Sequence, residues 1–173
     1  VNPESIEAAE REVDKMREQI KAYLVEISQR KLSQREALMI PDLIHCANDA
    51  ERISDLALKV CRKGDVVKGG IADPGAVSLV AGVAAQVRQF AHDTIDAMRN
   101  GKPPAFGPKS IDGGIRSAAR MATLELWNDQ PSRGAHTREY LALVSVFKCL
   151  GDISRHIGNI AVHVEMRAAR KNE

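Results

Sequence analysis

Apolar residues recur along nearly the whole chain at the three- and four-residue spacing of an amphipathic α-helix. No stretch shows the strict alternation, bounded by hairpin turns, that is typical of β-strands. Glycine- and proline-rich connections interrupt the pattern, most clearly at 100–108. The sequence therefore predicts an all-α fold of antiparallel helices joined by short loops. We expect these helices at about 3–29, 34–63, 76–99, 111–128 and 136–169.

Local signals mark several helix ends. Pro3 and Glu4 suit the first turn of a helix, because Pro needs no backbone donor there and Glu complements the helix dipole. Ser33 and Glu36 have the spacing of a capping box and predict the start of the second helix. Pro41 falls within that helix, where it removes a backbone donor, so we expect a kink or a late start there.

Composition narrows the class of protein. Aromatic residues make up 3% of the 173 residues, which favours a core of aliphatic side chains between helices. The formal net charge is +2, which does not indicate a nucleic-acid partner or a charged membrane surface. The sequence has no apolar run of ~18 residues. We expect Cys46, Cys61 and Cys149 to be small buried thiols in a reducing compartment, because they lie in apolar helical stretches and form no CxxC motif.

The chain contains an internal repeat. Residues 45–57 align with residues 149–161, and each stretch belongs to the last expected helix of its half. The aligned pairs are Ile53 with Ile157, Ser54 with Gly158, Asp55 with Asn159 and Ala57 with Ala161. Matched small residues and matched acid and amide positions favour duplication over a chance likeness between helices, and predict that the two stretches superimpose.

The most specific stretch of the chain is Glu51-Arg52-Ile53-Ser54-Asp55-Leu56-Ala57. It resembles the Glu-Arg-Ile-Gly-Asp-His-Ala element of PhoU proteins, and residues 10–24 resemble the helix that precedes this element. The likeness is greatest to the PhoU-like regions attached to bacterial sodium/phosphate cotransporters. Residues 157–161 resemble the second copy of the family element more weakly.

The resemblance implies two related antiparallel bundles of three helices. The first half has only two expected helices, so 1–63 corresponds to a truncated first repeat and 76–173 to a complete second repeat. The implied function is that of a non-catalytic regulatory domain associated with phosphate transport. The start at Val1 fits a C-terminal PhoU-like part of a sodium/phosphate cotransporter. Such a domain would lie in the cytoplasm, at the cytoplasmic face of the inner membrane. It would be linked to the membrane only through the covalently attached transporter domain.

The resemblance also implies a metal site, because PhoU-like proteins bind metal clusters through Glu/Asp-x-x-x-Asp motifs. The first half has two such motifs, formed by Glu10 with Asp14 and by Glu51 with Asp55. Residues four apart lie on one helix face, so both carboxylates can reach one cation. Four carboxylate groups suit iron, manganese or magnesium. The alternative is that Arg or Lys from neighbouring helices neutralises them.

The second half departs from this pattern. Arg155 and Asn159 stand where the first half has Glu51 and Asp55, and Asp152 can pair with Arg155 one turn away. Arg116 and Arg120 stand near the positions of the other two acids. We therefore expect no metal cluster in the second half.

Several partners and functions remain open at this point. Without its first helix, the first half should expose apolar residues of 6–27 or 43–60, which predicts a homodimer or a helix-swapped contact. We also expect a transporter membrane domain or a phosphate-signalling protein as a partner. We expect no nucleic-acid partner. One alternative function is a helical-bundle carboxylate metalloenzyme, although no Glu-x-x-His motif or other catalytic constellation occurs. Another is a purely structural oligomerisation bundle.

Overall fold

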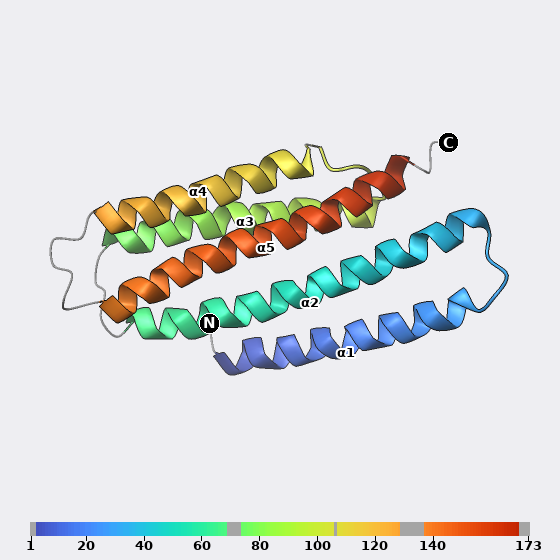
Figure 1. Cartoon of the computed structure of the whole chain (residues 1–173), viewed down its shortest axis with the longest axis horizontal. Coiled ribbons are helices and arrows are strands. Elements are labelled where there is room, and N and C mark those ends of the chain that lie inside the picture. The colour runs from blue at the N-terminus through green and yellow to red at the C-terminus, as the bar shows by residue number, and fades with distance from the viewer. Residues whose placement is uncertain (1–2, 69–73, 106, 129–136, 170–173) are drawn as a thin grey trace.

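The computed structural model describes all residues except 1–2, 69–73, 106, 129–136 and 170–173. The described part is all-α and contains no strand, as the periodicity predicts (Figure 1). Its helices are α1 (Pro3–Ser28), α2 (Gln34–Lys68), α3 (Pro74–Asn100), α4 (Pro108–Asn128) and α5 (Thr137–Ala169).

The capping box at the start of α2 forms as expected. The backbone N–H of Ser33 donates to the Glu36 carboxylate at 2.9 Å, and the backbone N–H of Glu36 lies 3.3 Å from the Ser33 hydroxyl. The late start at Pro41 is wrong, because α2 begins at Gln34 and runs through the proline. One backbone hydrogen bond is lost there, but α2 packs along both α1 and α5, and this packing outweighs the loss.

The second helix also extends past Gly64, where we expected it to end. Val67 packs against the core of the second half, so the last turns of α2 bury apolar surface that a loop would leave in water. Helix propensity is a weak prior that such tertiary contacts override. No helix of the described chain has the length and apolar character needed to span a bilayer.

Helix α5 lies at the centre of the arrangement. It packs against α2, α3 and α4, and α3 also packs against α4 (Figure 1). Among the described helices, α1 contacts α2 alone. The chain therefore forms a three-helix bundle of α3, α4 and α5, with α2 laid on α5 and α1 on the outer side of α2.

The buried core lies almost entirely in the three-helix bundle. Phe90 of α3 and Phe147 of α5 are its largest fully buried side chains. The apolar side chains of α2 that pack against this core are Ile53, Leu56, Val60 and Val67. The first half itself buries only Leu24, Ala47 and Leu58 among the described residues.

The expected first half, 1–63, contains α1 and most of α2, and the expected second half, 76–173, contains most of α3 with α4 and α5. The division into two repeats stays a prediction. The last helices of the two halves, α2 and α5, run antiparallel, since Asp42 meets His163 and Asp49 meets His156. Superposition of the two aligned repeat stretches stays a prediction.

Candidate functional site

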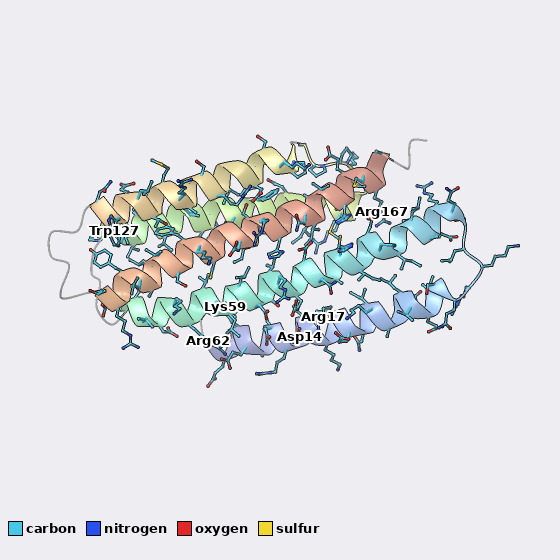
Figure 2. The ribbon with its side chains drawn as sticks, in the orientation of Figure 1. Asp14, Arg17, Lys59, Arg62, Trp127 and Arg167 are labelled. Carbon is cyan, nitrogen blue, oxygen red and sulfur yellow. The ribbon has the colours of Figure 1, made fainter. Side chains whose placement is uncertain are left out.

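Charged side chains line the seam between α1 and α2. Arg62 of α2 binds Glu7 of α1 at 2.9 Å, and Arg17 of α1 lies 3.2 Å from Glu51 of α2. These two contacts fix an antiparallel register that brings Asp14 to the level of Asp55. Figure 2 shows Asp14, Arg17 and Arg62 along this seam. The four carboxylates expected to bind metal, Glu10, Asp14, Glu51 and Asp55, therefore belong to one helix–helix contact, which we call the α1–α2 seam.

Glu51 is the least exposed acid with an ion pair at this seam, at 13% side-chain exposure. The Arg17 guanidinium, itself 25% exposed, binds Glu51 through one terminal nitrogen and Glu18 through the other, at 2.7 Å. Arg52 lies further from Glu51, at 3.7 Å, and is largely in solvent. Because a carboxylate removed from water needs a nearby positive charge, Arg17 is the group that stabilises Glu51.

The other three carboxylates are less tightly held. Asp55 lies 3.8 Å from the exposed Arg52, a separation at which a surface pair contributes little. Glu10 and Asp14 are half-buried and form no hydrogen bond or ion pair in the described part of the chain. No group of three or more His, Cys, Asp or Glu side chains among the described residues is placed to hold a metal ion. The residues at the seam thus do not fit a metal in this arrangement, and the metal set stays a prediction.

A different polar network lies between α4 and α5. Asp112 is buried, and Arg116 Nε lies 3.1 Å from both of its carboxylate oxygens. Ser154 of α5, which is fully buried, donates its hydroxyl to Asp112 at 3.1 Å. A Cβ at Gly158 would lie 3.3 Å from the Asp112 Cβ, so the glycine permits the close approach of α4. We did not expect this network, and its only signal in the sequence is the i, i+4 spacing of Asp112 and Arg116.

The expected pair of Asp152 and Arg155 is confirmed, with a separation of 2.9 Å. Position 155 therefore carries a cation that is neutralised by its own helix, in contrast to Glu51 at the aligned position. Asn159 turns toward the first half and donates to Asp49 of α2 at 3.3 Å.

Aspartates of α2 and histidines of α5 join the two halves of the chain. His156 Nδ1 lies 2.6 Å from Asp49, and His163 Nδ1 lies 3.1 Å from Asp42. The second contact falls outside hydrogen-bond geometry. The ring of His45 stacks on that of His163 with centroids 5.9 Å apart. The histidines looked scattered in the sequence, because only the antiparallel α2–α5 contact brings them together.

A cavity of about 240 Å³ opens between the start of α2 and the ends of α3 and α5. Its wall includes Leu43 and Cys46 of α2, and Arg99 and Arg167 stand among its polar lining residues. Burial, with Asp49 and Asp42 nearby, raises the pKa of the Cys46 thiol to about 11, so the thiol stays protonated at neutral pH. Burial also raises the pKa of Cys149. All three cysteines are free, with Cys149 buried and the other two half-buried.

Comparison with known proteins places the family likeness in the first half. Residues 4–63 match the model of the PhoU domain family. No curated protein and no solved structure matches the chain. The matched residues comprise almost all of α1 and most of α2, and so include the charged seam described above. The likeness to the PhoU domain therefore lies in α1 and α2, the helices that meet at the α1–α2 seam.

Proposed function

We propose that this chain is a non-catalytic regulatory domain of phosphate homeostasis that acts by contact with a phosphate-transport protein. The observation that carries the proposal is the PhoU domain match over residues 4–63. PhoU domains form a regulatory family, so the match supports this class of function. The finer proposal is that the chain is the cytoplasmic, C-terminal PhoU-like part of a sodium/phosphate cotransporter.

The chemistry of the polar groups supports a binding role. Glu51 and Asp112 are held by arginines, and Asp49 is held by His156 and Asn159. These contacts either connect two helices or neutralise a carboxylate where two helices meet. The polar groups therefore stabilise the helix bundle. The Cys46 thiol, with its raised pKa, is a poor nucleophile at neutral pH.

Exposed apolar side chains on α1 support a partner surface there. Met16, Ile20 and Tyr23 follow one another at helical spacing and are 46%, 44% and 62% exposed. Exposed apolar side chains grouped on one face are typical of interaction sites. We propose that this surface, the α1 stripe, is covered by a second copy of the chain. A transporter membrane domain or a phosphate-signalling protein would bind the resulting dimer.

The function can be tested in cells that depend on this chain for phosphate control. Ile20→Glu places a charge in the α1 stripe, whereas Ile95→Glu makes the same change on α3 at an equal exposure of 44%. We expect Ile20→Glu to abolish the adjustment of phosphate uptake to external phosphate, measured with labelled phosphate, and Ile95→Glu to leave it intact.

The regulatory proposal would be overturned if deletion of the whole chain left phosphate uptake and its regulation unchanged. If deletion changed phosphate control but Ile20→Glu did not, the regulatory proposal would stand and the partner surface would lie outside the α1 stripe. If Ile20→Glu only dissociated an oligomer, with phosphate control unchanged, a purely structural oligomerisation bundle would be the better description.

A further inference from the structure

We propose that Arg17 is the resident cation of the α1–α2 seam, so that the chain's own guanidinium, and not a metal ion, holds α1 on α2. The inference concerns Glu10, Asp14, Glu51 and Asp55, the acids at which the family resemblance implies a metal. It does not depend on the partner or the pathway that the domain serves.

The placement of Arg17 is the first support. The side chain extends from α1 across the seam, where its terminal nitrogens contact Glu18 at 2.7 Å and Glu51 at 3.2 Å. Its Nε is buried and has no hydrogen-bond partner in the described chain. An unpaired buried donor is unfavourable, so the two ion pairs must be what keep the guanidinium in this position.

The charge balance of the seam is the second support. Asp14 lies one turn before Arg17 on α1. The Glu7–Arg62 and Arg17–Glu51 contacts set a register in which Asp55 of α2 lies level with Asp14. Close carboxylates disfavour one another's charged forms unless a cation lies among them. Arg17 supplies that cation from within the chain. A divalent ion at Glu51 would have to displace the guanidinium and would be repelled by it.

The second half supports the same conclusion independently. Its buried acid, Asp112, is also neutralised by an arginine, with Arg116 Nε 3.1 Å from both carboxylate oxygens and a terminal nitrogen 3.1 Å from one of them. In both halves, therefore, the least exposed of the described acids with an ion pair is held by a guanidinium. The two ion pairs differ in which helices supply the charges. Arg17 of α1 binds an acid of α2, whereas Arg116 and its acid both lie on α4.

The test uses the chain stripped of metal by a chelator. We expect its melting temperature to be unchanged when iron, manganese or magnesium is added. Arg17→Met keeps most of the side-chain length and removes the charge. It should lower the melting temperature by about 3–6 °C, the range for loss of a partly buried pair in a chain of this size. Hydrogen exchange should locate the loss in α1, because α1 contacts α2 alone among the described helices.

Two further variants separate charge from packing. Arg52→Met removes an exposed arginine that lies 3.7 Å from the same carboxylate, and it should shift the melting temperature by less than about 1 °C. Glu51→Gln combined with Arg17→Met removes both charges and should recover at least half of the loss caused by Arg17→Met alone. This recovery is the signature of an ion pair in a double-mutant cycle.

Three results would overturn the proposal. A rise in the melting temperature of the unaltered chain on adding any of these metals would make the metal the resident cation. Failure of Glu51→Gln to compensate would show that Arg17→Met acts through lost packing. Equal effects of Arg17→Met and Arg52→Met would show that neither arginine is specific to the seam. If Arg17→Met does not fold, the metal titration of the unaltered chain still decides.

Discussion

The two halves of this chain reach stability in different ways. In α3–α5, three helices pack against one another around Phe90 and Phe147, and aliphatic residues of all three helices are buried. In α1–α2, the helices bury only three apolar side chains and meet across the charged α1–α2 seam. Helix α2 is secured mainly by its contact with α5, and α1 depends on α2 alone. Figure 1 shows α1 as the outermost helix on its side.

This difference bears on the proposed function. The half that matches the PhoU domain is the half with the smaller core and the apolar α1 stripe. Burial of apolar surface is the main driving force of folding. Because α1 and α2 bury little apolar surface between them, their stability depends on contact with the second half. A helix held by few contacts is also free to present its outer face to a partner.

The largest effect should come from the core of the second half. Phe147→Ala removes a side chain that is 1% exposed and should lower the free energy of unfolding by about 3–5 kcal/mol. Denaturant unfolding measures this loss, with the exposed Leu141→Ala on the same helix as control. If α1 and α2 stayed protected from hydrogen exchange after α3–α5 unfolded, the stability of the first half would not depend on the second.

A smaller and more local effect should come from the first half. Leu24→Ala empties one of the three buried apolar positions of α1–α2 and should cost about 2–3 kcal/mol. Hydrogen exchange should show the loss in α1, with α3–α5 unchanged, because α1 has no contact with those helices. The adjacent, exposed Val25→Ala is the matched control. Loss of protection spread evenly over all helices would contradict the comparison.

The α1 stripe should affect association more than stability. Ile20→Glu lies at an exposed position and should change the free energy of unfolding by less than about 0.5 kcal/mol. Light scattering should show a dimer for the unaltered chain and a monomer for this variant, with Ile95→Glu remaining a dimer. A monomer across the concentration range for the unaltered chain would remove the homodimer from the proposal.

The smallest effect concerns pH at the start of α2. The hydroxyl and then the backbone N–H of Ser33 bind the Glu36 carboxylate and hold its pKa below the ordinary value. Because the folded pKa is depressed, the stabilisation is complete above the unfolded pKa and is lost as pH falls through the folded one. Melting curves between neutral pH and pH 3 should show this loss, and Ser33→Ala should reduce it. An unchanged pH profile in Ser33→Ala would assign the acid sensitivity to other carboxylates.

Helix positions were largely predictable because their signals are local. Apolar spacing and the Ser33–Glu36 capping box place helix boundaries to within a few residues. The errors fall where a distant contact outweighs a local signal. Pro41 did not delay α2, because this helix packs along both α1 and α5. Gly64 did not end it, because its last turns pack against the core of the second half.

The sequence by itself determined the helices, since apolar spacing and capping signals are local, and it placed the acids Asp49 and Glu51 on one of them. Only the tertiary structure decided what neutralises those acids. Arg17 reaches Glu51, and His156 reaches Asp49 from 107 residues away, because α2 runs antiparallel to both α1 and α5 in one particular register. That register is the outcome of packing along whole helices. Residues within one turn of each other do not specify which charged side chain meets which.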